Sequence, residues 1–93
     1  MRFIYKKSYL KSLDKAEPFL KRLILRTDKE IKDYLETGVA SYGLRVKKIG
    51  QKSFEARVSD KIRIVWVREK DLTSFVVVGN LEEVQRYLRS FER

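Results

Sequence analysis

The 93-residue sequence contains no cysteine and no histidine. Without cysteine the chain forms neither a disulfide framework nor a thiolate metal site. Without histidine it lacks the usual zinc ligand and the side chain that most often carries protons at neutral pH. Any catalytic mechanism must therefore do without a thiolate or an imidazole, and we expect no metal and no cofactor.

Long apolar runs are also missing from the sequence. No run approaches the ~20 residues that cross a bilayer, and the N-terminus lacks the uncharged apolar core of a signal peptide. We therefore expect a cytoplasmic protein. A length of 93 residues with 43% hydrophobic residues predicts one domain, residues 1–93, with a small core.

Positive charge is abundant and unevenly distributed. The net charge is +9, from 22 basic and 13 acidic residues. Residues 41–70 carry nine basic and three acidic side chains, whereas residues 71–93 carry three and four. A concentration of this kind predicts a basic patch, and basic patches attract the phosphate backbone of nucleic acids.

The spacing of apolar residues predicts the order of the elements. Residues 2–6 alternate as a strand, residues 8–13 suit a short helical turn, and residues 15–37 repeat at helical spacing. Strands are predicted at residues 44–49, 54–58, 61–67 and 72–79, and a last helix at residues 81–91. This order predicts an α+β fold: a small twisted antiparallel β-sheet with an N-terminal helical pair and a C-terminal helix.

The helix ends and the apolar helix stripes are also predicted. Asp14 with Glu17, and Asn80 with Glu83, resemble capping pairs, and Gly38 suits the end of the long helix. The stripe of the long helix includes Phe19, and the last helix carries the stripe Leu81, Val84, Leu88 and Phe91.

The segment 54–66 has the pattern of a β-hairpin. One phase of the alternation is apolar and must be buried: Phe54, Ala56, Val58, Ile62, Ile64 and Trp66. Since a slip of one residue would turn all of these side chains outward, burial sets the register. Val58 then faces Ile62 across a three-residue loop, and Arg57 faces Arg63 on the other side of the sheet.

We predict that this other side of the hairpin is open and binds an anion. Two opposed arginines repel each other by up to ~1 kcal/mol, which a bound phosphate would reverse. Four lysines of the preceding strand and the turns would surround the pair: Lys47, Lys48, Lys52 and Lys61. In the alternative, Glu55 neutralises Arg57 along the strand and the face is merely solvated.

The sequence resembles toxins of the RelE/ParE superfamily, and is closer to the RelE-like mRNA interferases. The resemblance rests on Phe54-Glu55-Ala56-Arg57-Val58, on Lys61-Ile62-Arg63-Ile64-Val65-Trp66, and on Val77-Val78-Gly79-Asn80 with Glu82-Glu83-Val84 and Tyr87. The deduced order of elements matches the fold of that family over the whole chain.

The resemblance implies a toxin with an acidic antitoxin as its partner. RelE-like members enter the ribosomal A site and cut mRNA with basic residues and often a C-terminal tyrosine. By position, Arg57, Arg63 and Tyr87 match such residues. The pattern departs from the family at Leu81, near which many relatives have a histidine or arginine, and at Glu55, which corresponds to a lysine of RelE.

Roles for these residues follow from the chemistry of RNA cleavage. Arg57 and Arg63 would stabilise the charge on the oxygens of the phosphorane, and Lys48 and Lys52 would hold flanking phosphates. Tyr87 would stack on a base or donate a hydrogen bond, or it simply flanks the core. The general base is Glu55 or a basic residue with a lowered pKa.

Two other functions stay open from the sequence. ParE-like members inhibit DNA gyrase and are not nucleases, and a non-catalytic homologue would bind RNA without cutting it.

Overall fold

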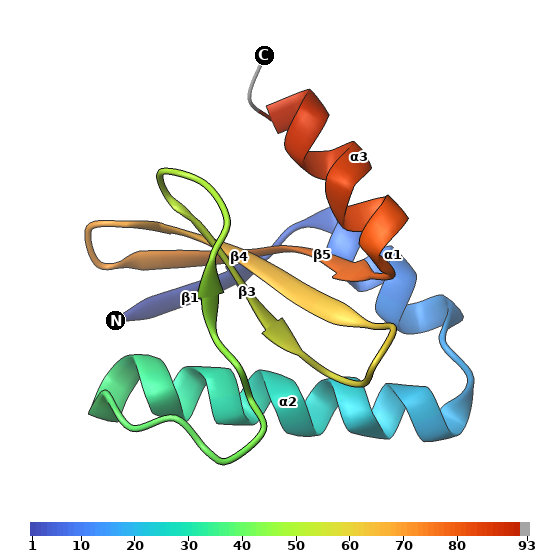
Figure 1. Cartoon of the computed structure of the whole chain (residues 1–93), viewed down its shortest axis with the longest axis horizontal. Coiled ribbons are helices and arrows are strands. Elements are labelled where there is room, and N and C mark those ends of the chain that lie inside the picture. Colours follow the sequence, from blue (N-terminus) through green and yellow to red (C-terminus); the bar gives the residue numbers. More distant parts are fainter. Residues whose placement is uncertain (92–93) are drawn as a thin grey trace.

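The computed structural model describes the backbone of residues 1–91 and the side chains of residues 1–90. The chain order is β1 (Arg2–Tyr5), α1 (Lys7–Lys15), α2 (Pro18–Thr37), β2 (Lys47–Lys48), β3 (Ser53–Arg57), β4 (Arg63–Glu69), β5 (Leu72–Gly79) and α3 (Leu81–Phe91). The described strands form one sheet in the order β1-β5-β4-β3-β2 (Figure 1). The predicted α+β architecture is confirmed.

The sheet is mixed, so the prediction of an all-antiparallel sheet is wrong at one edge. β2, β3, β4 and β5 pair antiparallel, but β1 lies parallel to β5, with Phe3 opposite Thr73. The two strands are joined through both N-terminal helices and the rest of the sheet, with no hairpin between them. Alternation along a strand carries no information on the direction of such a distant partner.

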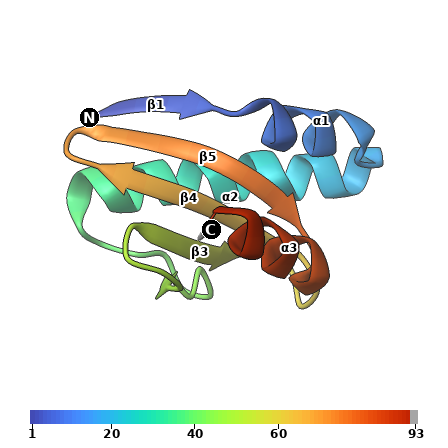
Figure 2. The same ribbon diagram turned by 90° about the horizontal axis from the view of Figure 1, so that it is seen from above.

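The helices cover both faces of the sheet, α2 on one and α3 on the other (Figure 2). Tyr9 of α1 and Ile24 and Ile31 of α2 pack with the sheet residues Ile64, Trp66 and Phe75. The six hairpin residues that were predicted to be buried all belong to this cluster or pack against it, so that prediction is confirmed. Val84 of α3 packs on the opposite face against Val65, Val67, Val76 and Val77. β5 is therefore buried on both faces, as its continuous apolar run predicts.

The helix ends follow local chemistry, with one correction. The side chain of Glu17, not Asp14, caps α2 by accepting from the backbone N–H groups of Phe19 and Leu20 at 3.1 and 2.5 Å. α2 therefore begins at Pro18, later than predicted, since proline suits the first helical position. Gly38 ends α2 in the left-handed region at φ 79°. Asn80 and Glu83 cap α3 reciprocally, at 2.9 and 3.0 Å, which confirms the predicted pair.

Three further predictions need correction. The strand predicted over residues 44–49 is reduced to Lys47–Lys48, because Gly43 and Arg45 have positive φ and interrupt extended backbone. Phe19 and Leu81 lie in the predicted helix stripes, yet they are 60% and 61% exposed. Both occupy the first turns of their helices. The side chain of Phe91 lies outside the described residues.

No helix in residues 1–91 is long and apolar enough to span a membrane.

A buried polar cluster lies between β1, α1 and α2. The Tyr5 hydroxyl donates to Asp28 Oδ2 at 2.6 Å, whereas the buried Tyr9 hydroxyl has no hydrogen-bond partner among the described residues. Burial, and then the neighbouring Asp28 carboxylate, raise the pKa of both phenols above their ordinary value. The folded protein therefore keeps both tyrosines protonated at pH values where the unfolded chain loses its phenolic protons.

This cluster predicts opposite effects for two similar substitutions. Tyr5→Phe should cost about 1–3 kcal/mol, because the buried Asp28 Oδ2 loses its hydrogen-bond donor and keeps only the Lys32 ammonium, 3.7 Å away. Tyr9→Phe should be neutral or stabilising, because it removes an unpaired hydroxyl. The wild-type free energy of unfolding should fall as the pH rises above about 10, because the unfolded state then binds fewer protons. Chemical denaturation of the three proteins at neutral and alkaline pH measures both effects. Equal losses in the two variants would contradict the assignment.

Candidate functional site

The β3–β4 hairpin has the register predicted from its apolar residues. Phe54 faces Trp66, Ala56 faces Ile64, and Arg57 faces Arg63. The Val58 N–H donates to the Ile62 carbonyl at 2.9 Å and closes the turn. Because alternate residues share a face, Glu55, Arg57 and Arg63 all start from the face that α3 covers in part.

That face is not open along its length, which corrects the predicted open hairpin face. Val65 is the next residue of the same face after Arg63 on β4, and it is fully buried. The valines of β4 and β5 form a second apolar core beneath α3. The charged residues therefore lie at the margin of a buried patch. The sequence did not reveal this because α3 covers the patch only in the folded chain.

Arg63 and Glu55 form a largely buried ion pair on this margin. Arg63 Nε lies 3.4 Å from Glu55 Oε2, and the two side chains are 20% and 16% exposed. Arg63 Nη1 also donates to the carbonyl oxygens of Ser59 and Asp60 in the turn, at 2.7 and 3.2 Å. Glu55 therefore pairs diagonally with Arg63 rather than along the strand with Arg57. The pair holds one cationic fork and one carboxylate in a defined mutual position.

Arg57 points to a different environment from Arg63. Its Nη1 lies 4.0 Å from Asp60 Oδ1, and Asp60 is fully exposed. The residue lines a cavity with α2 and with the segment that precedes β2, and its Nε is buried without a hydrogen-bond partner among the described residues. The repulsion expected between opposed arginines is thus relieved, because each guanidinium has its own carboxylate.

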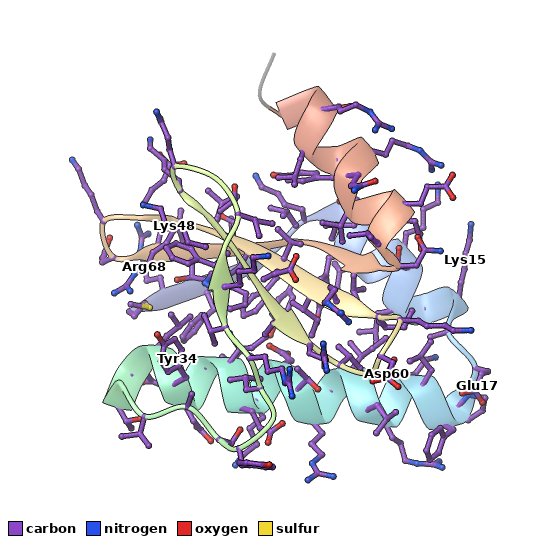
Figure 3. The ribbon with its side chains drawn as sticks, viewed as in Figure 1. Lys15, Glu17, Tyr34, Lys48, Asp60 and Arg68 are labelled. Atoms are coloured by element: carbon purple, nitrogen blue, oxygen red, sulfur yellow. The ribbon has the colours of Figure 1, made fainter. Side chains whose placement is uncertain are left out.

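The four predicted lysines are all exposed but do not encircle the arginines. Lys47 is paired with Glu55 in the sheet and shares its face, whereas Lys48 is paired with Phe54 and lies on the α2 face. Lys52 forms an ion pair with Glu69 at 3.4 Å, and Lys61 lies in the hairpin turn. Figure 3 shows Lys48 and Arg68 toward the end of the sheet opposite to Asp60. The positive charge therefore extends along the hairpin.

Tyr87 lines a groove on the α3 side of the sheet. The groove has a volume of about 440 Å³, and it is lined by Ile4, Lys6, Ser8, Val67, Glu69, Leu72, Ser74, Val76 and Tyr87. Tyr87 also packs against the second apolar core, and burial raises the pKa of its phenol. The ring therefore stays neutral at physiological pH. Within the described chain, Arg57 and Arg63 are not among the residues that line this groove. Lys6, Ser8 and Glu69 were not predicted as site residues, because only the pairing of β5 with both β1 and β4 brings them together.

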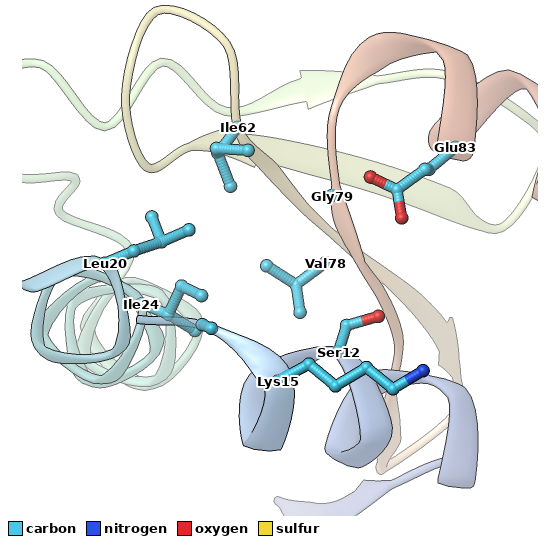
Figure 4. Close-up of a pocket in the computed structure, with 9 residues that line it drawn as sticks. Ser12, Lys15, Leu20, Ile24, Ile62, Val78, Gly79 and Glu83 are labelled. Carbon is cyan, nitrogen blue, oxygen red and sulfur yellow. The ribbon is translucent and has the colours of Figure 1, made fainter. Parts of the chain in front are cut away.

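A smaller cavity lies near the turn of the β3–β4 hairpin and includes Ile62 in its lining. It has a volume of about 200 Å³ and lies where α1, the start of α2 and the end of β5 meet (Figure 4). Its floor includes Leu20, Ile24 and Val78, and Lys15 and Glu83 lie at its rim. An apolar side chain with a charged flank would suit this shape. Among the described residues, no three carboxylates converge in a way that would hold a metal ion.

The sequence matches no protein-family model and no curated protein. Solved structures share the fold. A copper-bound mutant toxin from Helicobacter pylori aligns with a TM-score of 0.67 and 15% identity, over 90% of this chain and 98% of that chain. YafQ from E. coli strain BL21(DE3) aligns with a TM-score of 0.67 and 13% identity, over 90% and 98%.

One chain of the RelB–RelE antitoxin–toxin complex from Methanococcus jannaschii is also similar. It aligns with a TM-score of 0.65 and 17% identity, over 90% of this chain and 96% of that chain. The chain thus has the fold of these toxins, and the RelE-like fold predicted from the sequence is confirmed.

Proposed function

We propose that this chain is the toxin of a toxin–antitoxin pair, and that it inhibits translation by cutting messenger RNA in the ribosomal A site. The observation that carries the proposal is the fold, which proteins named YafQ and RelE share at TM-scores of 0.67 and 0.65. The net charge of +9 supports an RNA target, because neutralised phosphates release their counterions. Such a protein would act in the cytoplasm, where the ribosomes are.

The proposed reaction is a transesterification within the RNA strand. The ribose 2′-oxygen attacks the adjacent phosphorus and loses its proton to a base, and the bond from phosphorus to the 5′-oxygen breaks. The leaving oxygen takes up a proton, so the products are a 2′,3′-cyclic phosphate and a 5′-hydroxyl end. The reaction needs a base, a proton donor and cationic stabilisation of the charged phosphorane, and it needs no metal or cofactor.

The Glu55–Arg63 pair supplies the base and the cationic stabilisation in this proposal. The Arg63 guanidinium stabilises the phosphorane, an interaction that often makes the largest single contribution to catalysis. The Glu55 carboxylate, 3.4 Å from Arg63 Nε, is the candidate general base. Arg57, opposite Arg63 on β3, adds a second positive charge beside the reacting phosphate.

The remaining predicted residues would hold the RNA on either side of the cut. Tyr87 keeps a neutral phenol that stacks on a base or donates a hydrogen bond. The exposed lysines of the hairpin region would contact flanking phosphates: Lys47, Lys48, Lys52 and Lys61. Phosphate contacts of this kind position the strand without reading its sequence.

The partner in this proposal is a cognate acidic antitoxin. Support comes from structures of related folds that contain an antitoxin, the RelB–RelE complex from Methanococcus jannaschii and the DinJ–YafQ complex from E. coli. An acidic chain suits a protein of net charge +9, because opposite potentials speed association and favour the correct partner.

Cleavage on translating ribosomes tests the proposal directly. The purified protein is added to ribosomes that translate a defined message, and primer extension maps new 5′ ends. We expect cuts that require both the protein and the ribosome. Absence of cuts with inhibition of gyrase supercoiling would replace the proposal by a ParE-like activity. Salt-sensitive RNA binding with neither activity would make the chain a non-catalytic homologue.

A further inference from the structure

Two exposed cations occupy backbone positions that do not suit them. In the described chain, two residues other than glycine have a positive φ, Arg45 at 51° and Lys70 at 54°. A residue with a Cβ atom is disfavoured in this left-handed region, where glycine fits without steric cost. Both residues are exposed, and neither has an ion-pair partner among the described residues. Neither burial nor a salt bridge therefore accounts for a cation at these positions.

Lys70 stands where a hairpin of this kind favours glycine. Glu69 pairs with Leu72, so Lys70 and Asp71 form a two-residue turn between β4 and β5. Of these two residues, only Lys70 has a positive φ, which is the pattern of a type II′ turn. The first position of that turn favours glycine. The stability of the turn alone would therefore select glycine at this position, and not lysine.

Arg45 interrupts the extended backbone just before the edge strand β2. The preceding residue, Leu44, is buried, and its carbonyl accepts from the Arg57 N–H at 2.9 Å. Arg45 itself is exposed, so its side chain is not needed for the core. Lys47 and Lys48 follow on β2. The left-handed residue therefore begins a run of cations along this edge of the sheet.

The two positions lie at the ends of one path of exposed cations. β2 continues into a loop that ends at Lys52, whose carbonyl accepts from the Arg68 N–H at 2.9 Å, and Lys70 follows in the turn. Figures 1 and 2 both show this loop and the β4–β5 turn at the same end of the sheet. We call the exposed cations along this path the basic track: Arg45, Lys47, Lys48, Lys52, Arg68 and Lys70.

Carboxylates neutralise little of the basic track. Glu69 pairs with Lys52 at 3.4 Å, whereas Asp71 pairs with Arg2, outside the track, at 3.7 Å. The other five cations of the track have no ion-pair partner among the described residues. None of the large apolar residues exposed in the described chain falls within residues 43–71, so a protein partner would find no apolar anchor there. A row of unpaired cations without such anchors favours a chain of phosphates.

We propose that Arg45 and Lys70 bind phosphates of an RNA strand at the two ends of the basic track. The inference deepens the proposed function and rests on RNA as its target. Unfavourable backbone conformations in folded proteins are concentrated at functional sites, where binding offsets their cost. Each cation at a left-handed position is therefore retained for a phosphate contact, although glycine would make the fold more stable.

Replacement by glycine separates binding from folding. In the 93-residue chain, Arg45→Gly and Lys70→Gly should each raise the unfolding temperature by about 2–8 °C, because glycine relieves the left-handed backbone. Each variant should bind a short single-stranded oligoribonucleotide about fivefold more weakly at about 0.1 M salt. The slope of log K against log salt concentration should become shallower by about 0.7 for each lost phosphate contact. Fluorescence anisotropy at several salt concentrations measures the affinity and the slope.

Control variants separate the two contacts from the general effect of charge. Arg45→Lys and Lys70→Arg keep the charge and should bind RNA as the wild type does. Lys11→Gln removes one exposed lysine of α1, at the other end of the sheet (Figure 1), and should change the affinity by less than about 2-fold. Poly-L-glutamate is the second anionic probe and represents an acidic protein.

Each outcome decides the proposal. Weaker RNA binding with a shallower salt slope in both glycine variants, and wild-type binding by the charge-retaining variants, support it. Losses no larger than that of Lys11→Gln overturn it. Weaker binding of poly-L-glutamate with unchanged binding of RNA would assign the residues to an acidic protein and overturn it too. A lowered unfolding temperature would show that the fold itself needs these cations, with the same consequence.

The result is distinguishable from the fate of the proposed function. Since no cleavage is measured, a wild-type protein that binds RNA without cutting it would refute the ribonuclease and leave the two contacts standing. A wild-type protein that cuts messenger RNA, with glycine variants that bind RNA normally, would refute the two contacts alone.

Discussion

Arg63→Ala is expected to lower ribosome-dependent cleavage by about 100-fold or more, in the range found when one donor that stabilises transition-state charge is removed. The guanidinium lies 3.4 Å from Glu55 and is the cation proposed to face the reacting phosphate. Primer extension on a defined message measures the rate of cutting. Arg86→Ala is the control, because Arg86 lies on α3 in an exposed pair with Glu82, and it should cut at the wild-type rate.

Arg63 also stabilises the hairpin, so loss of activity alone does not establish a catalytic role. Its Nη1 donates to the carbonyl groups of Ser59 and Asp60, and its removal leaves Glu55 buried without its cation. Arg63→Lys keeps the charge but loses the planar fork. If this variant unfolds at the wild-type temperature and still cuts poorly, the fork itself is required. Wild-type cutting by folded Arg63→Ala would show that Arg63 has no catalytic role.

Phe75→Ala is expected to cost about 3–5 kcal/mol, a large part of the roughly 5–15 kcal/mol that holds a small domain folded. Phe75 is fully buried in β5 and forms ring contacts with Phe3, Tyr5, Tyr9 and Trp66. The partner rings come from β1, α1 and β4, so truncation of Phe75 leaves a cavity where these three elements meet β5. Urea denaturation at neutral pH measures the loss.

Phe19→Ala makes the same chemical change at an exposed position and is the control. Phe19 is 60% exposed in the first turn of α2, so its truncation should cost less than about 1 kcal/mol. Equal costs for the two variants would mean that the ring cluster around Phe75 does not dominate the core.

The local features of the fold were predictable because their causes are local. The register of the β3–β4 hairpin follows from the burial of alternate residues, and Arg57 faces Arg63 as that register requires. Gly38 and the Asn80–Glu83 pair end and begin helices through bonds to their immediate neighbours. The corrected cap of α2 belongs to the same class, since the preference of proline for the first helical turn already points to Glu17.

Two of the errors arose where distant segments decide the outcome. β1 is parallel to β5, although its own alternation is compatible with either direction. The margin of the hairpin was expected to be open, because the phase that contains Glu55, Arg57 and Arg63 is charged. Val65 belongs to the same phase, and α3 buries it together with the valines of β5.

In the candidate site, too, the local features were predictable and the effects of distant segments were not. By itself the sequence determined the chemical repertoire of this protein: no thiol, no imidazole, and two arginines opposed across a hairpin. Only the tertiary structure decided where those arginines point. Arg63 turns to Glu55 and the hairpin carbonyls, whereas Arg57 lines a cavity with Arg26 of α2. The physical reason is that strand register sets the positions of Cα atoms, while a long flexible side chain takes its direction from acceptors and neighbours on other elements.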